Sequence, residues 1–184
     1  MRPSVLSIAE RARVFGAPRY REIGKGLVAL DAKWQEANTV LITIPQLRGV
    51  NCNGVPASGK VRVHTLARAP FMLVFAEIAA AGFLADILTY DGLFYPRHIG
   101  SNVARPLSSH SWGIAIDLNA AWNGYGKPPA KAGARGSVRR LVPIFARYGF
   151  AWGGDWDGDE METDENPRVR DGMHWELVRV GVAA

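Results

Sequence analysis

The stretch Ser108-Ser-His-Ser-Trp-Gly-Ile-Ala-Ile-Asp-Leu118 decides the fold of this chain, because it joins a strand pattern to metal-binding side chains. Between residues 113 and 118, Ile or Leu occupies every even position, and Gly, Ala or Asp occupies every odd one. Successive side chains of a strand point to opposite faces, so one face would be apolar and the other would end in the carboxylate of Asp117. His110 lies just before this strand, where a turn could place its imidazole over the same face.

A second stretch, Asp171-Gly-Met-His-Trp-Glu-Leu177, shows the same alternation far downstream. Its apolar residues alternate with His174 and Glu176, so a neighbouring strand could bring His174 to the first stretch. Two imidazoles and one carboxylate suit zinc, and a tetrahedral ion with three side-chain ligands keeps one position for water. The sequence therefore predicts one catalytic Zn²⁺ bound by His110, Asp117 and His174.

Asp171 stands three residues before His174, and the Gly that follows it permits a tight turn. This spacing places a second carboxylate near the ion without making it a ligand. We expect Asp171 to act as general base, taking a proton from the attacking water and returning it to the leaving amine. In the alternative interpretation, Asp171 caps a turn and Asp117 pairs with an Arg.

Arg97, in Tyr95-Pro-Arg-His98, is a candidate for binding the substrate. Its guanidinium could stabilise negative charge on the scissile carbonyl oxygen, or hold a terminal carboxylate through two hydrogen bonds. Against this interpretation, the chain has 22 Lys and Arg residues, most of which must be solvated. His98 and His64 are interpreted as structural histidines, with a role for His98 left open.

The pattern Ser-x-His-x-x-Gly-x-Ala-x-Asp at residues 108–117, with Asp-x-x-His, an aromatic residue and Glu downstream, resembles a known family. This is the zinc D,D-carboxypeptidase and L-alanyl-D-glutamate endopeptidase family of peptidoglycan peptidases, which includes many phage endolysins. The resemblance covers residues 86–178 and implies the same three zinc ligands and the same catalytic base. It also includes the Tyr95–His98 segment, so Arg97 is expected to contact the substrate. Ser108, the first residue of the motif at 108–117, is expected to contact it as well.

The resemblance implies a zinc metallopeptidase that hydrolyses amide bonds in peptidoglycan stem peptides, as a phage endolysin or a cell-wall remodelling enzyme. Both L-Ala-D-Glu endopeptidase and D-Ala-D-Ala carboxypeptidase activities stay open, although Asp at position 171 is more like the endopeptidase branch. An alternative is a zinc-containing cell-wall binding module of the same fold, which would not need a base. A serine hydrolase would need a triad of Ser108 or Ser111 with His110 and Asp117. It is disfavoured, because these residues are too close in sequence and no Gly-x-Ser-x-Gly elbow is present.

Length and patterning favour a single α+β domain. With 184 residues, 48% of them apolar, the chain can bury a core of its own. Strands and helices are mixed without regular βαβ alternation, which favours a small central antiparallel sheet with flanking helices. The resemblance implies the hedgehog/D,D-peptidase type of this class. Within the domain, residues 1–60 are expected to flank a catalytic core at residues 61–180.

Local signals predict the main elements. Ser7 and Glu10 form a capping box for a helix that ends at Phe15, before Gly16. Pro143 should kink or delay the helix predicted at residues 137–148. Apolar and β-rich runs further predict a helix at residues 70–81 and strands at 39–44, 61–63 and 87–90. The Gly-, Pro- and Lys-rich residues 125–136 predict a loop, which is a candidate lid or substrate-facing loop.

Charge and composition set the expected partners. A net charge of +5 favours an anionic partner, and we expect the bacterial envelope, with no nucleic acid, because basic residues are dispersed and no nucleic-acid-binding motif is present. The single Cys52 excludes a disulfide framework. The sequence lacks a secretory apolar run and a stretch of the ~20 apolar residues that span a membrane. We therefore expect a protein made in the cytoplasm, without integral membrane association. We also expect a monomer, and the family resemblance implies release to the cell wall by a phage holin.

The acidic loop Asp155-Trp-Asp-Gly-Asp-Glu160 does not have the spacing of a calcium-binding EF-hand loop, which needs Gly at its sixth position and Glu at its twelfth. We interpret it as a solvated loop. Asp155 and Trp156 are expected to contact substrate, because they lie close in sequence to the second metal-binding stretch.

Overall fold

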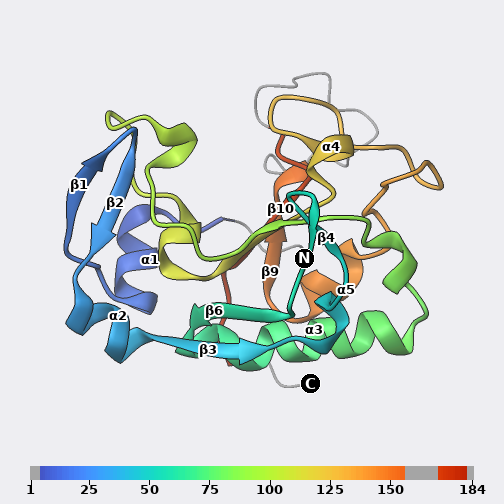
Figure 1. Cartoon of the computed structure of the whole chain (residues 1–184), viewed down its shortest axis with the longest axis horizontal. Helices are drawn as coiled ribbons and strands as arrows, with labels where there is room; N and C mark the ends of the chain where they lie inside the picture. The colour runs from blue at the N-terminus through green and yellow to red at the C-terminus, as the bar shows by residue number, and fades with distance from the viewer. Residues whose placement is uncertain (1–4, 156–169, 182–184) are drawn as a thin grey trace.

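The computed structural model describes residues 5–155 and 170–181 (Figure 1). The helices are α1 (Ile8–Phe15), α2 (Ala32–Asn38), α3 (Arg68–Ala80), α4 (Ala120–Asn123) and α5 (Val142–Arg147). The strands are β1 (Tyr20–Gly24), β2 (Leu27–Leu30), β3 (Thr39–Thr43), β4 (Asn51–Cys52), β5 (Val55–Pro56), β6 (Lys60–His64), β7 (Tyr90–Gly92), β8 (Ala115–Leu118), β9 (Phe150–Trp152) and β10 (His174–Leu177).

A four-stranded antiparallel sheet organises the molecule. Its strands lie in the order β7-β8-β10-β9, so the strand that carries Asp117 is the neighbour of the strand that carries His174. In the described part of the chain, β1 with β2, β3 with β6 and β4 with β5 form further two-stranded antiparallel sheets. The predicted fold class, α+β with a small antiparallel sheet and flanking helices, is confirmed.

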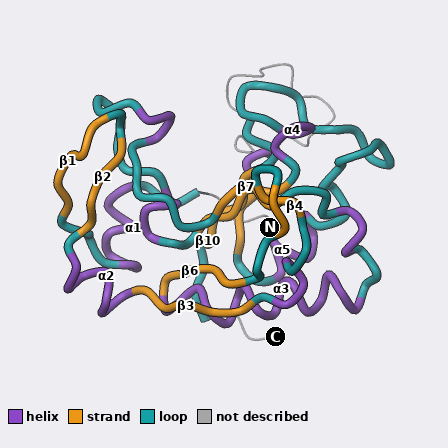
Figure 2. Tube along the Cα trace, viewed as in Figure 1, coloured by secondary structure: helices purple, strands orange, loops and turns teal. Residues whose placement is uncertain are grey.

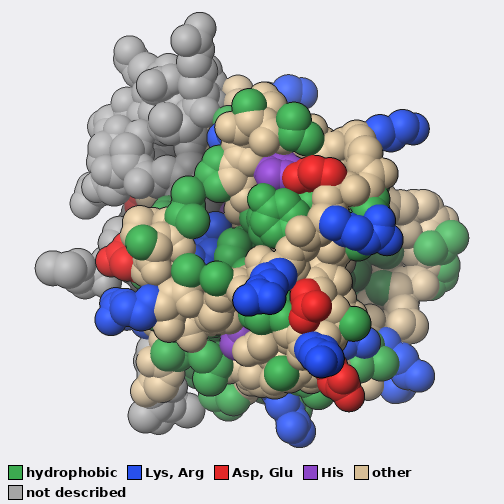
Figure 3. Space-filling model, turned by 90° about the vertical axis from the view of Figure 1, so that its left-hand side faces the viewer, with side chains coloured by type: hydrophobic (Ala, Val, Ile, Leu, Met, Phe, Trp, Pro, Cys, Tyr) green, Lys and Arg blue, Asp and Glu red, His purple; other side chains and the backbone are tan. Residues whose placement is uncertain are grey.

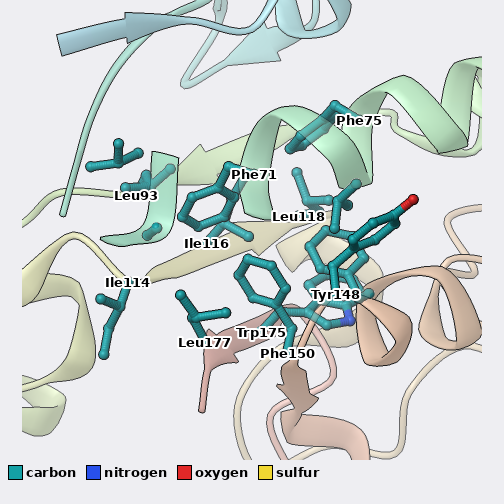
Figure 4. Packing of buried hydrophobic residues seen from close by; sticks show 14 of the residues in the cluster. Phe71, Phe75, Leu93, Ile114, Ile116, Leu118, Tyr148, Phe150, Trp175 and Leu177 are labelled. Atoms are coloured by element: carbon teal, nitrogen blue, oxygen red, sulfur yellow. The ribbon is translucent and has the colours of Figure 1, made fainter. Parts of the chain in front are cut away.

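One face of the central sheet packs against α3 and forms the core. Figure 4 shows Ile116 and Leu118 of β8 and Trp175 of β10 grouped with Phe71 and Phe75 of α3. All five side chains are fully buried. Burying an aliphatic or aromatic side chain of this size stabilises a fold by about 1.5–3 kcal/mol. The alternate residues of β8 and β10 therefore point away from α3, toward the opposite face of the sheet.

Local signals fix the ends of two helices as predicted. The side chain of Ser7 accepts a hydrogen bond from the backbone N–H of Glu10, and the Glu10 carboxylate accepts one from the backbone N–H of Ser7. This capping box begins α1, and Gly16 follows its end. Pro143 stands in the first turn of α5, whose start is delayed to Val142. A proline is tolerated there because the first turn has no intrahelical partner for its missing N–H.

The strand predicted at residues 87–90 begins later than expected: Thr89 forms an isolated bridge with Asn51, and the strand β7 is Tyr90–Gly92. The backbone N–H groups of Leu88 and Thr89 donate to Oδ1 of Asn119, at 2.8 and 2.9 Å. A side chain thus satisfies the backbone groups that a neighbouring strand would otherwise pair.

Two long connections of the chain consist mostly of loop. Figure 2 shows that the chain between α4 and α5 is mostly loop. Between β7 and β8 the described elements are two short 3-10 helices, Ile99–Ser101 and Ser109–Trp112. On the face shown in Figure 3, basic side chains are spread over the surface with acidic side chains among them. In residues 5–155 and 170–181, no helix combines the length and the apolar character needed to cross a membrane.

Candidate metal centre

The register of β8 and β10 brings two predicted ligands together. The strands are antiparallel, and Asp117 is the direct partner of His174. Side chains of directly opposed residues project from the same face of a sheet, with Cβ atoms about 4.5–5.5 Å apart. Backbone pairing therefore sets the distance between this imidazole and this carboxylate.

His110 reaches the same place from the 3-10 helix Ser109–Trp112, which precedes β8. That helix ends at Gly113, which has the left-handed conformation (φ 71°, ψ 34°). A Cβ added at Gly113 would lie 2.9 Å from the backbone nitrogen of His64. Glycine therefore permits both the turn and the close approach of β6.

The three predicted ligands form one buried cluster of donor atoms. Nδ1 of His174 lies 3.0 Å from Oδ1 of Asp117 and 3.1 Å from Nε2 of His110. That Nε2 lies 3.2 Å from Oδ2 of Asp117. Ligand atoms about 2.0–2.1 Å from a tetrahedral zinc ion would lie about 3.3 Å apart. The donor set and its spacing fit a zinc ion.

Hydrogen bonds outside the cluster orient both imidazoles. Nδ1 of His110 lies 2.7 Å from the carbonyl oxygen of Leu93, to which it can donate, and this tautomer leaves a lone pair on Nε2. Nε2 of His174 lies 3.2 Å from Oγ of Ser109 and 3.4 Å from Oε2 of Glu176. A proton on that Nε2 leaves Nδ1 as the metal-binding atom. The two histidines thus present different ring nitrogens to the same point.

The charges in the cluster favour a cation. Burial alone would raise the pKa of Asp117, but the charge of His110 and hydrogen bonds from both histidines lower it below its ordinary range. Burial alone would lower the pKa of His174, but its hydrogen bonds to Asp117 and Glu176 raise it well above the ordinary value. Positive charge between these carboxylates is stabilised, whether a proton or a metal ion carries it.

Asp171 lies beside the cluster, at the turn that leads into β10. Its backbone N–H donates to the Gly153 carbonyl at 2.6 Å, and its own carbonyl accepts from the N–H of His174 at 2.9 Å. Its Oδ1 is buried and has no hydrogen-bond partner among the described residues. Burial, with a smaller effect of the Asp117 charge, raises the pKa of Asp171 to about 6, against nearby cationic groups that lower it. A carboxyl group with this pKa and an unengaged oxygen suits proton transfer near neutral pH.

The cluster and Asp171 line a common pocket of about 520 Å³. Ligand pockets of proteins commonly have volumes of this order. Arg97 and Ser108 also line it, as does Tyr125, which lies in the loop predicted to face the substrate. The structure therefore brings together the predicted ligands, the predicted base and two predicted substrate contacts.

Backbone contacts on two sides hold Arg97 at the pocket. The hydroxyl of Ser111 accepts from the Arg97 N–H and donates to the Arg97 carbonyl, both at 3.0 Å. The backbone N–H of Ser108 donates to that carbonyl at 2.9 Å. On the other side, Leu27 of β2 forms an antiparallel bridge with Arg97. The hairpin of β1 and β2 thus helps to place the backbone of Arg97.

Four other candidate residues have different surroundings. Asp155 lies in the 3-10 helix Gly153–Asp155 and is not among the described residues that line the pocket, so its contact with substrate stays a prediction. Trp156 lies outside the described residues. His98 contacts Glu22 and the Arg105 carbonyl, and His64 contacts the Phe15 carbonyl. These contacts give both histidines structural partners.

Sequence reasoning did not find two residues that support the predicted ligand His174, namely Ser109, which contacts it, and Arg11, which acts through Glu176. Arg11, on α1, forms a buried ion pair with Glu176 at 3.1 Å. Ser109 contacts His174. The position of Ser109 directly before the predicted ligand His110 could have indicated its place beside the cluster. No sequence signal links Arg11 to Glu176, because only the tertiary fold brings α1 to β10.

The contacts of Ser109 also resemble the order of a serine-hydrolase triad, Ser109 to His174 to Asp117. Two observations separate the site from such a triad. Glu176 shares Nε2 of His174 with the hydroxyl, and His110 occupies the space beside Nδ1. A triad of Ser108 or Ser111 with His110 and Asp117 is not formed, because the Leu93 carbonyl contacts Nδ1 of His110 and Asp117 contacts its Nε2.

Comparison with known proteins identifies one family. Residues 101–177 match the family described as D-alanyl-D-alanine carboxypeptidase. Neither the comparison with curated proteins nor that with solved structures found a match. The matched stretch is less than half of the chain, and it contains His110, Asp117, Asp171 and His174. The family similarity therefore falls on the residues that form the candidate metal centre.

Proposed function

We propose that this chain is a zinc-dependent peptidase that hydrolyses an amide bond in the stem peptides of peptidoglycan. The observation that carries the proposal is the buried cluster of His110, Asp117 and His174, which shares one pocket with Asp171. The family match supports the substrate class, since the name of that family describes a peptidase of D-alanyl-D-alanine ends. The resemblance of the motifs to peptidoglycan peptidases agrees with it.

The proposal assigns a role to each candidate residue. A zinc ion at the site would supply Lewis-acid activation of water and of the scissile carbonyl. Asp171 would accept a proton from the attacking water and deliver it to the leaving amine. Arg97 would donate hydrogen bonds to the carbonyl oxygen as its negative charge develops, or hold a carboxylate of the substrate. Ser108, Asp155 and Trp156 are proposed as substrate contacts.

Two cleavage sites are compatible with this pocket. The name of the matched family favours a D-Ala-D-Ala carboxypeptidase, whereas Asp at position 171 favours an L-Ala-D-Glu endopeptidase. Digestion of purified peptidoglycan followed by mass spectrometry distinguishes them. Free D-Ala indicates the carboxypeptidase, and a new D-Glu amino terminus indicates the endopeptidase.

The decisive experiment separates zinc binding from hydrolysis. We expect a chelator to abolish hydrolysis and added zinc to restore it. Asp171→Asn should keep one zinc ion per chain and lower kcat by about 10²–10⁴-fold, because it removes the base. Asp31→Asn is the matched control, since Asp31 caps α2 away from the pocket and Asn is an equally good cap.

Two outcomes would contradict the proposal. Undiminished hydrolysis by Asp171→Asn would remove the assigned base. A wild-type protein that binds zinc and peptidoglycan but releases no new termini would instead support the alternative, a zinc-containing cell-wall binding module. The buried, unpartnered oxygen of Asp171 favours the enzyme, because a binding module needs no base at this position.

We further propose that the protein acts on the cell wall as a monomer, as an endolysin released through a holin. The similarity of its motifs to those of phage endolysins supports this proposal. Lysis of bacteria only when the chain and a holin are produced together would agree with it. Equal lysis without a holin would contradict the release step.

A further inference from the structure

Helix α1 contacts the candidate metal centre through one side chain. Arg11 lies on this helix, and its NH2 group is 3.1 Å from Oε1 of Glu176, two residues after the ligand His174. Arg11 is 6% exposed and Glu176 is 4% exposed, so this ion pair is shielded from water. The two residues are 165 positions apart in the sequence, and Arg11 lies outside the stretch that matches the peptidase family.

A second contact fixes the position of α1 over the site. Trp112 belongs to the 3-10 helix that carries His110, and its Nε1 donates to the carbonyl of Gly16, at the end of α1, at 2.7 Å. The guanidinium of Arg11 lies 5.4 Å from the centroid of the same indole ring. Arg11 in the middle of α1 and Gly16 just after its end therefore both contact segments that carry metal ligands.

The carboxylate of Glu176 faces both Arg11 and His174. Its Oε1 accepts from Arg11, and its Oε2 lies 3.4 Å from Nε2 of His174. A proton on Nε2 is required if Nδ1 is to bind the metal, and Glu176 accepts that proton's hydrogen bond. A buried carboxylate without a compensating charge is costly, so the ion pair with Arg11 stabilises Glu176 in this position.

We propose that Arg11 is a positioning residue for the metal centre. It holds the carboxylate of Glu176 in place, Glu176 contacts the Nε2 side of the His174 ring, and the ring thereby keeps Nδ1 beside Asp117 and His110. The N-terminal segment, expected from the sequence only to flank the catalytic core, thereby completes the support of a ligand. This inference rests on the proposed zinc site and concerns metal affinity rather than the peptide bond cleaved.

The test measures the zinc Kd of the full chain by competition with a chromogenic chelator. Arg11→Met should weaken zinc binding by about 10–100-fold, as loss of such outer partners does in other metal sites. Arg13→Met should leave the Kd unchanged, because Arg13 is exposed on the same helix. Melting of the zinc-free proteins, followed by circular dichroism, reports the fold separately.

A double variant keeps the test decisive if Arg11→Met alone does not fold. Arg11→Met with Glu176→Gln removes both charges, and the amide oxygen can still accept from His174. Replacing both members of a buried ion pair is tolerated far better than removing one. We expect the double variant to recover most of the lost zinc affinity.

Three results would overturn the inference. A folded Arg11→Met variant with the wild-type Kd would show that the arginine does not position the ligand. A folded double variant that still binds zinc about 10–100-fold more weakly than the wild type would show that uncompensated charge is not the cause of the loss, whether or not Arg11→Met folds. Absence of zinc binding in the wild-type chain would instead overturn the proposed function, and this inference with it.

Discussion

The backbone carbonyl of Gly113 accepts a hydrogen bond from the N–H of His64 at 2.9 Å, where β6 meets the turn that carries His110. No side chain fits between the two segments at this point, since a Cβ on residue 113 would lie 2.9 Å from that nitrogen and 3.1 Å from the backbone of Val63. The position of one metal ligand thus depends on a close contact between backbones.

Gly113→Ala should destabilise the protein and weaken zinc binding. A non-glycine residue in the left-handed conformation costs about 1 kcal/mol, and the contact with β6 adds to that cost. Gly49→Ala is a matched control, because Gly49 also has a positive φ but has no atom within 4 Å of its added Cβ. Urea unfolding and zinc titration of both variants measure the difference. Equal losses of stability in the two variants would show that the contact with β6 contributes nothing.

Ser109→Ala distinguishes the metal site from a serine hydrolase. Loss of a nucleophilic serine costs about 10⁶-fold in kcat. Loss of an outer partner of a metal ligand affects chiefly metal affinity, by about 10–100-fold. We therefore expect Ser109→Ala to hydrolyse peptidoglycan within about tenfold of the wild-type rate when zinc is saturating. Complete inactivity at saturating zinc, with normal folding, would point to the serine mechanism.

Arg97→Gln should lower kcat/KM by about 10²–10³-fold, the usual effect of removing one donor that stabilises developing negative charge. Zinc affinity should not change, because Arg97 lines the pocket and is not one of the ligands. Arg19→Gln, at an exposed position, serves as the control. Kinetics on a synthetic stem peptide give kcat and KM separately. A rise in KM alone would assign Arg97 to substrate binding rather than to the transition state.

The ion pair of His98 with Glu22 should make stability depend on pH. Its hydrogen bond to Glu22 raises the pKa of His98 in the folded protein above the value of about 6.5 expected when unfolded. The stabilisation is therefore complete below about pH 6.5 and is lost as the pH rises through the folded pKa. Glu22→Gln should lower the melting temperature more at pH 6 than at pH 9, whereas the exposed Glu36→Gln should show no such difference. An equal decrease at both pH values would contradict this interpretation.

Features that depend on neighbours in the chain were predictable from the sequence. The capping box of Ser7 and Glu10 and the delayed start at Pro143 are local, and the structure has both. The metal cluster was also predictable, although it joins distant segments. Strand alternation fixes which side chains share a face, so Asp117 and His174 could meet once their strands paired.

Features that depend on tertiary contacts were not predictable. The Asn119 side chain occupies the backbone N–H groups of Leu88 and Thr89, and no pattern within residues 87–90 reveals this. The pairing of Arg11 with Glu176 likewise has no local signal, because any of the many basic residues could have met that carboxylate.

Because Asp117 pairs directly with His174, binding of the proposed zinc ion would depend on correct assembly of the sheet. If β10 slipped by one residue against β8, every side chain of β10 would change faces, and an indole or a thioether would replace the imidazole. Only the native alignment would then hold the ion. Zinc at about 100 times its Kd would favour that alignment by about 2.7 kcal/mol over misaligned forms that do not bind it. The ion would thus stabilise the native strand pairing, which creates its own binding site, over misaligned pairings.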